Sequence, residues 1–257
     1  KISVLFLQEQ NMKIGVVQTR PVKGNVGQNV AAHERWVGLA ADSGAEMVIF
    51  PELSLTGYEP TLAAGLAMGV DDPRLDGLQA LSDERRVTIG AGLPLQTGAG
   101  VAIAMALLQP QQPRRPYGKQ YLHADEVPFF VPGVGFPVLQ TAVSPPLALA
   151  ICYELSIPAH AETAHRHGAG VYIASVSKSA DGVVKAGERL AAIARQYGMP
   201  VLMANNVGSS DDFVGGGGTA VWDRQGSLLH QLDEASEGFI IYDSVVEQMV
   251  MTMVVDG

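Results

Sequence analysis

The chain has 257 residues, of which 47% are hydrophobic and 17% are charged. That length provides for a large buried core, and α/β chains of this size often form one domain. The formal charge is −9 at pH 7, and no block or stripe of lysine and arginine occurs, so nothing resembles the basic footprint of a nucleic-acid-binding protein. Charges, proline or glycine interrupt every apolar stretch before about 18 residues, so no transmembrane helix is predicted.

The chain contains a single cysteine, Cys152, so an intrachain disulfide is impossible. A lone cysteine fits a reducing compartment, and we expect a cytoplasmic protein. The apolar run at residues 2–7 is too short for the hydrophobic region of a signal peptide, and no small-residue cleavage site follows it. We therefore interpret residues 1–11 as a leader or a mis-assigned start, with a native extra strand as the alternative, and predict one domain over residues 12–257.

Short apolar strands alternate with amphipathic helices along the chain, which is typical of repeated α/β units. In chain order the predictions are strand 13–18, helix 29–44, strand 46–50, helix 74–86, strands 87–95, 100–110 and 146–154, helix 157–169, strand 171–177, helix 186–198, strand 200–208, and a strand pair within 219–232 that turns at Gln225 and Gly226. Four glycines at 215–218 lack the following Lys-Ser/Thr of a phosphate-binding loop. They predict a flexible loop or a close-packed backbone turn.

Reactive side chains follow three of the predicted strands. Glu52 comes directly after the strand at 46–50, Lys119 lies in "YGKQYL", and Cys152 ends the apolar run "LALAIC". A thiol near a helix N-terminus often has a lowered pKa, which favours the reactive thiolate. Strand ends at one edge of an α/β sheet converge on a site. A carboxylate, a thiol and an ammonium brought together there are suited to attack on a carbonyl carbon.

Glu126 and three histidines are further candidates. Glu126 lies seven residues after Lys119, beside apolar residues. His160, His165 and His167 lie on one predicted helix, but their spacings do not place all three on one face, so a metal site is not predicted. A histidine commonly activates a cysteine. A Cys-His hydrolase or transferase therefore stays an alternative.

Three blocks, "FPELSLTGY", "YGKQYL" and "ICYE", resemble the catalytic blocks of the nitrilase (carbon-nitrogen hydrolase) superfamily and come in that family's order. The similarity continues through "QT" after the first strand, "DE…FF.PG", "AN.VG" and the late "G.T.VWD..G.LL", and so spans nearly the whole chain from Met12. The resemblance is to the amidase-like branch. It implies a four-layer α-β-β-α sandwich.

The resemblance also implies a catalytic triad of Glu52, Lys119 and Cys152, with Glu126 as a second glutamate beside it. In the implied reaction Glu52 takes the thiol proton and the sulfur attacks an amide. Lys119 and the backbone N–H of Tyr153 hold the oxyanion, and water releases the acid from a thioester. The resemblance implies no metal or organic cofactor, a small-molecule amide or carbamoyl substrate, and a homodimer that forms through the helical face.

The cysteine block departs from the family pattern because no arginine follows Cys152 and Tyr153. An arginine there would bind a substrate carboxylate, so its absence favours a neutral or cationic small amide, although Lys178 is another source of positive charge. Tyr58 is a candidate wall of the substrate site. The alternatives within the family are nitrile hydrolysis and acyl transfer to an amine. A catalytically inactive binding protein is the non-enzymatic alternative.

Overall fold

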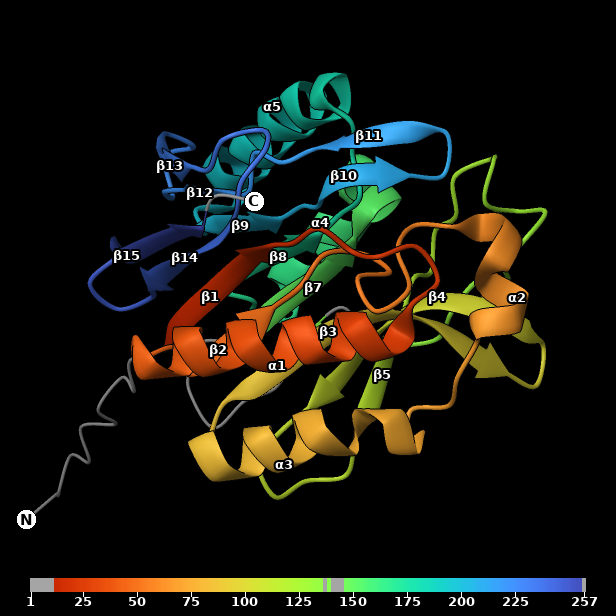
Figure 1. Cartoon of the computed structure of the whole chain (residues 1–257). Helices are drawn as coiled ribbons and strands as arrows, with labels where there is room; N and C mark the ends of the chain where they lie inside the picture. The colour runs from red at the N-terminus through yellow and green to blue at the C-terminus, as the bar shows by residue number, and fades with distance from the viewer. Residues whose placement is uncertain (1–11, 136–137, 140–145, 256–257) are drawn as a thin grey trace, which may run out of the picture.

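The computed structural model describes residues 12–135, 138–139 and 146–255 (Figure 1). The predicted leader or mis-assigned start at residues 1–11 lies outside these ranges. Within them, no helix combines the length and the apolar character that a membrane span requires.

The larger of two sheets has, among the described residues, seven strands in the order β15-β14-β1-β2-β3-β4-β5. Their bounds are β1 (Lys13–Gln18), β2 (Met47–Ile49), β3 (Thr88–Thr97), β4 (Gly100–Leu108), β5 (Arg115–Gly118), β14 (Glu237–Asp243) and β15 (Gln248–Val255). The central strands β1, β2 and β3 are parallel, and the outer pairs are antiparallel. Parallel central strands place the ends of β2 and β3 at the same edge of the sheet.

The smaller sheet has, in the described part of the chain, six strands in the order β13-β12-β9-β8-β7-β6. Their bounds are β6 (Val138–Leu139), β7 (Leu147–Ile151), β8 (Val171–Ser175), β9 (Val201–Ala204), β12 (Ala220–Trp222) and β13 (Leu228–Gln231). A separate hairpin joins β10 (Val207–Ser210) to β11 (Phe213–Gly216). Strands β7, β8 and β9 are parallel, so the chain again leaves this sheet at one edge.

Helices cover the outer face of each sheet, as Figure 1 shows for α1 and α3 on one side and α5 on the other. The longer helices are α1 (Val26–Asp42), α3 (Asp76–Arg85), α4 (Pro158–Arg166) and α5 (Ala180–Tyr197), and the short ones are η1 (Pro60–Leu62), α2 (Ala63–Leu66), η2 (Pro73–Leu75) and η3 (Cys152–Ser156). One apolar cluster fills the space between the sheets, and one more lies under each helical layer. This is the four-layer α-β-β-α sandwich.

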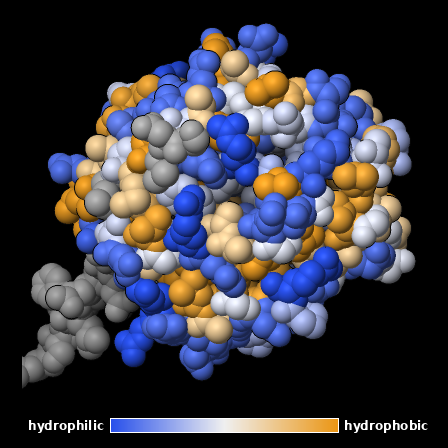
Figure 2. All heavy atoms as spheres, viewed as in Figure 1, coloured by the Kyte–Doolittle hydropathy of each residue, from blue (hydrophilic) through white to orange (hydrophobic). Residues whose placement is uncertain are grey.

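Polar and apolar residues are interspersed on the face seen in Figure 2, which is usual for a folded protein.

Most predicted elements are confirmed, and the exceptions have local causes. Helix α5 begins six residues before the predicted start because Ser179 is its N-cap and accepts a hydrogen bond from Gly182 N, whereas Gly198 at φ +61° ends it as expected. The single strand predicted at 200–208 is wrong, because Asn205 and Asn206 separate β9 from β10. Strands β14 and β15 lie beyond the last predicted element.

Candidate active site

Glu52 follows β2 by three residues, and the other sheet fixes the loop that carries it. Glu52 N donates to Val176 O (3.3 Å), and Ser175 Oγ donates to Phe50 O (2.8 Å). Gly92 on β3 allows the loop to approach closely, because a Cβ there would lie 2.4 Å from backbone atoms of the loop. The Glu52 side chain is therefore held, fully buried, between the two sheets.

Lys119 comes directly after β5 and is also fully buried. Its backbone N donates to Ile103 O (2.8 Å), and its carbonyl oxygen accepts from Gly133 N (2.7 Å). Its ammonium contacts two carboxylates, Glu52 Oε1 at 2.8 Å and Glu126 Oε1 at 2.5 Å. Strand β5 and the loop that contains Gly133 thus position the Lys119 ammonium between the carboxylates of Glu52 and Glu126.

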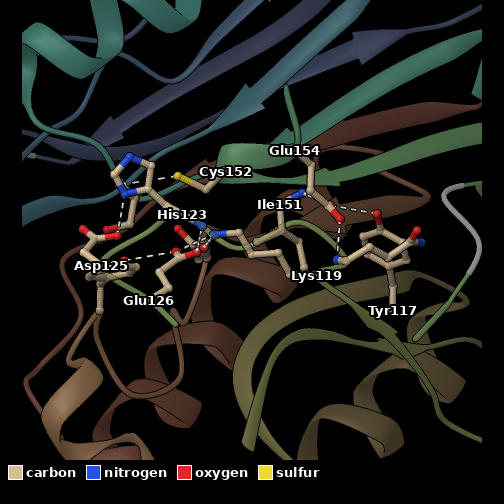
Figure 3. A network of polar contacts seen from close by, with 12 residues as sticks. Tyr117, Lys119, His123, Asp125, Glu126, Ile151, Cys152 and Glu154 are labelled. Atoms are coloured by element: carbon tan, nitrogen blue, oxygen red, sulfur yellow. Dashed lines mark hydrogen bonds and ion pairs between the residues drawn. The ribbon is translucent and has the colours of Figure 1, made fainter. Parts of the chain in front are cut away.

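Glu126 lies beside Lys119 (Figure 3) and shares its ammonium with Glu52. Its Oε1 also accepts a hydrogen bond from Tyr58 OH (3.1 Å), and its Oε2 accepts one from His123 N (2.8 Å). Every oxygen of this carboxylate therefore has a donor. Tyr58 forms part of the cavity wall, and its hydroxyl helps to orient Glu126.

Cys152 ends β7 more abruptly than the predicted strand, which extended to residue 154. It adopts φ +44° at the start of η3, a backbone conformation that costs a non-glycine residue about 1–3 kcal/mol. The turn leaves Cys152 partly exposed in a cavity, with its Sγ 4.0 Å from Ser177 O. Such strained residues cluster at functional sites.

The electrostatics of the site differ from the sequence expectation for the thiol. Burial raises the pKa of Cys152, and the Glu52 charge raises it further, while Lys178 and Lys119 lower it. The expected lowering of the thiol pKa is therefore wrong, because the apolar surroundings and the nearby carboxylate outweigh the cations. The resting cysteine is a thiol and needs a base.

Glu52 is suited to be that base. Burial raises its pKa, against the opposing effect of the Lys119 charge and a smaller one of Cys152. Among the described residues Glu52 Oε2 has no hydrogen-bond partner. Burial by itself lowers the pKa of Lys119, but the surrounding acids outweigh it and raise that pKa above its ordinary value. The lysine therefore stays an ammonium.

Cys152 opens onto a cavity of about 420 Å³. Its lining residues are Tyr58, Pro60, His123, Asp125, Glu126, Phe129, Cys152, Tyr153, Ser177, Lys178, Ser179, Gly182, Asp211, Asp212 and Phe213. The predicted residue Tyr153 is among them, and its ring meets His123 edge-on at 5.1 Å. The cavity therefore combines aromatic walls with charged groups of both signs.

The sequence signature of the family described as carbon-nitrogen hydrolase matches residues 13–250. The chain belongs to the carbon-nitrogen hydrolase family. A hydrolase from Mycobacterium tuberculosis is 29% identical to it over 166 residues, which cover 62% of this chain and 58% of the relative. A glutamine-dependent NAD(+) synthetase from Thermotoga maritima is 25% identical over 96% of this chain and 44% of the synthetase. The chain thus spans roughly half the length of these two relatives.

Solved structures of an amidase of the nitrilase superfamily, from Nesterenkonia sp. AN1, share the fold. A cysteine-to-alanine variant superposes with a TM-score of 0.82 at 23% identity, over 92% of each chain. Another structure of that amidase contains butyramide. In a third, at TM-score 0.81 and 24% identity over 90% of each chain, the acetamide moiety of fluoroacetamide is added covalently at the active-site cysteine. The chain therefore shares the fold of that amidase.

The support behind one wall of the site was not predicted from the sequence. Asn205 binds the backbone of Lys178 twice, through Lys178 N to Oδ1 (2.9 Å) and Nδ2 to Lys178 O (3.1 Å). Asn206 Oδ1 accepts from Ser177 Oγ (3.0 Å). The signal was present in "AN.VG". The four glycines behind this wall are close-packed, since a Cβ on Gly216 would lie 2.4 Å from a backbone nitrogen of α5.

The three histidines of the predicted helix 157–169 have different surroundings. His160 is buried between Tyr117 and Tyr172, and burial lowers its pKa to about 4. His165 packs against the ring of Tyr197, and His167 Nδ1 contacts Thr163 O at 2.8 Å. None of the three lines the cavity of Cys152.

Proposed function

We propose that this carbon-nitrogen hydrolase cleaves the C–N bond of a small amide through a Cys152 thioester. The main support for this proposal is the fully buried ion pair between Lys119 Nζ and Glu52 Oε1, which lie 2.8 Å apart. This pair lies next to a cysteine that opens onto a cavity. Ion pairs buried so completely are costly unless further groups satisfy them. A catalytic role would explain why this costly ion pair lies beside the Cys152 nucleophile.

In the first half-reaction Glu52 takes the thiol proton and the Cys152 sulfur attacks the amide carbon. The raised pKa of both groups supports a direct transfer from a resting thiol to the carboxylate. The developing oxyanion is held by the Lys119 ammonium and the backbone N–H of Tyr153. Glu52 then returns its proton to the departing nitrogen, the C–N bond breaks, and the acyl group stays on sulfur.

In the second half-reaction water attacks the thioester carbon. Glu52 takes a proton from this water, the C–S bond breaks, and the proton returns to sulfur, so the carboxylic acid leaves and the enzyme is regenerated. Glu126 is a positioning residue in this scheme. Its oxygens accept from Lys119, Tyr58 and the backbone of His123, which orients the ammonium between the two acids.

We infer that the substrate is a neutral or cationic small amide. Four carboxylates, Asp125, Glu126, Asp211 and Asp212, line the cavity, against one lysine, Lys178. This balance disfavours an anionic substrate. A volume of about 420 Å³ fits a small molecule, and the butyramide in the Nesterenkonia amidase supports the choice of a short amide.

One observation favours a second candidate, the Cys-His hydrolase. His123 lines the same cavity as Cys152, and its Nδ1 lies 2.5 Å from Asp125 Oδ1, the arrangement in which a carboxylate orients a histidine base. However, the His123 side chain is 56% exposed, whereas Glu52 is enclosed with Lys119. We therefore place His123 at the cavity rim.

Matched substitutions distinguish the two bases. A screen of short amides, carbamoyl compounds and nitriles, read by ammonia release and acid formation, is run on the wild type, Cys152→Ala, Glu52→Gln and His123→Gln. We expect no turnover for Cys152→Ala, a loss of about 10³-fold for Glu52→Gln, and less than about fivefold for His123→Gln. Near-normal turnover by Glu52→Gln, with loss in His123→Gln, would establish the Cys-His candidate. A thioester adduct on Cys152, detected by mass spectrometry, tests the intermediate.

A further inference from the structure

Glu154 is a buried carboxylate for which the proposed reaction has no use. It lies two residues after Cys152 and is fully buried. Its Oε2 accepts a hydrogen bond from Ile151 N at 2.8 Å, and its Oε1 accepts one from Gln120 N at 2.7 Å (Figure 3). Ile151 directly precedes the nucleophile, and Gln120 directly follows Lys119. One side chain therefore joins the backbones that carry two reactive groups.

The two backbones belong to different sheets. Lys119 follows β5 of the larger sheet, whereas Cys152 follows β7 of the smaller one. Neither sheet alone determines the separation of the ammonium and the sulfur, since no ladder of hydrogen bonds crosses the sandwich between β5 and β7 in the described residues. Glu154 crosses this gap with two backbone contacts, one to each side.

A chain of hydrogen-bonded side chains also fixes the Glu154 carboxylate. Tyr117 OH donates to Glu154 Oε2 at 2.8 Å and lies 2.9 Å from His160 Nε2, while His160 Nδ1 lies 3.0 Å from Tyr172 OH. Because the tyrosine proton goes to the carboxylate, His160 Nε2 donates to Tyr117 and His160 Nδ1 accepts from Tyr172. Every hydrogen bond in the chain then points toward Glu154.

The contacts favour an ionised Glu154. Two N–H groups and one O–H group are aimed at its oxygens, and a protonated carboxyl would lose an acceptor position to its own hydrogen. Burial outweighs the two backbone hydrogen bonds and the Tyr117 hydroxyl, so the pKa of Glu154 lies above its ordinary value. A buried carboxylate that accepts three hydrogen bonds is held rigidly. It is therefore suited to fix the distance between the Lys119 and Cys152 backbones.

We propose that Glu154 is a positioning residue that fixes Lys119 against Cys152 across the two sheets. The proposal rests on the proposed function only for the roles of those two residues. It requires both the charge of the carboxylate and its length, because the two backbone N–H groups must be reached at once.

The single cysteine makes the test direct, since alkylation of the chain by iodoacetamide reports on Cys152 alone. In that reaction the thiolate forms an S–C bond and iodide leaves. The rate is measured against pH for folded wild type and Glu154→Gln, with Ser82→Ala as the matched control, because Ser82 is a buried polar residue of α3 that donates to Val87 O (2.7 Å) far from the site. Melting temperatures show which variants are folded.

We expect the midpoint of the alkylation profile to move to higher pH in Glu154→Gln, with about a tenfold lower rate at pH 7.5. A displaced Lys119 no longer stabilises the thiolate, so the thiol pKa rises. Simple removal of a negative charge would lower that pKa. A midpoint that moves to lower pH, or does not move in folded protein, therefore overturns the proposal. Ser82→Ala is expected to lose stability without moving the midpoint.

Glu154→Asp keeps the charge and shortens the side chain by one methylene, so it reaches only one of the two backbone N–H groups. We expect its midpoint to lie above that of the wild type, and this variant decides the matter if Glu154→Gln does not fold. A wild-type profile in Glu154→Asp would contradict the proposal, because charge alone would then suffice.

Amide turnover measured in parallel separates this proposal from the proposed function. If the wild type hydrolyses no amide but the alkylation midpoint shifts as expected, the reaction assignment fails and the positioning role holds. If the wild type hydrolyses amides and the midpoint does not shift, the positioning role fails. Where both hold, kcat falls in Glu154→Gln and KM changes little.

Discussion

Lys178 places an ammonium on the wall of the cavity that contains Cys152, in addition to the buried ammonium of Lys119. Its stem packs over Gly182, where a Cβ would lie 3.2 Å from Lys178 Cβ, and its charge lowers the pKa of Cys152. Removal of this charge in Lys178→Met should raise the thiol pKa, so alkylation at pH 7.5 should slow by about threefold. The control is Lys185→Met, an exposed lysine of α5 outside the cavity lining. Equal rates for the two variants would contradict a role for Lys178.

His33 makes stability depend on pH. The imidazole is fully buried, its Nδ1 donates to Asn29 O (2.7 Å), its Nε2 accepts from Ser54 Oγ (2.9 Å), and burial lowers its pKa from 6.5 to about 4. Between these values the unfolded chain binds the extra proton, so the contribution of His33 is complete above pH 6.5 and declines as the pH falls toward 4.

The comparison with His33→Gln isolates that contribution from other titrating groups. The free energy of unfolding is measured in urea at pH 7.5 and pH 5 for both proteins. The wild type should lose about 2 kcal/mol more than the variant over this interval. The same pH dependence in both proteins would show that His33 does not titrate in this way.

At the scale of elements, the contact between β5 and the loop at Gly133 sets the place of Lys119. A Cβ on Gly133 would lie 2.5 Å from Gly118 Cα and 2.9 Å from Lys119 N, and these are backbone atoms that cannot move aside cheaply. Gly133→Ala should therefore lower stability by about 1–3 kcal/mol and reduce amide turnover at least tenfold. Gly98→Ala, with no atom near its Cβ, should do neither. Thermal melts and ammonia release measure both effects.

The elements themselves were largely predictable because their signals are local. Apolar periodicity and caps such as Gly198 predicted the helices and most strands. The pairing of β14 with β1 could not be predicted in this way, because it joins residues more than 200 positions apart. By contrast, Glu52, Lys119 and Cys152 could be proposed from the sequence as candidate site residues. The contact of Glu154 with Gln120 N could not be predicted, since the sequence around it does not say which backbone a buried carboxylate reaches.

At the scale of the whole molecule, either of two helical faces could form the interface of the expected homodimer. The groove between α1 and α3 is lined by charged residues at half its positions, namely Glu34, Arg35, Asp42, Glu84 and Arg85. The cleft beside α4 and α5 is lined mainly by apolar and aromatic residues, among them Leu155, Ile157, Pro158, Ala161, Ala192, Ile193 and Tyr197. Because the centres of interfaces are poor in charge and rich in aromatic residues, we predict that the dimer forms through α4 and α5.

A pair of identical substitutions on the two faces tests this prediction. Ala192 and Ala80 are both exposed helical alanines, the first at the α4–α5 cleft and the second at the α1–α3 groove. Light scattering after size exclusion should give twice the chain mass of 27.1 kDa for the wild type and for Ala80→Glu. Ala192→Glu should give the single-chain mass, since the interface would bury an unpaired charge. A dimer that resists Ala192→Glu and dissociates in Ala80→Glu would move the interface to the opposite layer of the sandwich.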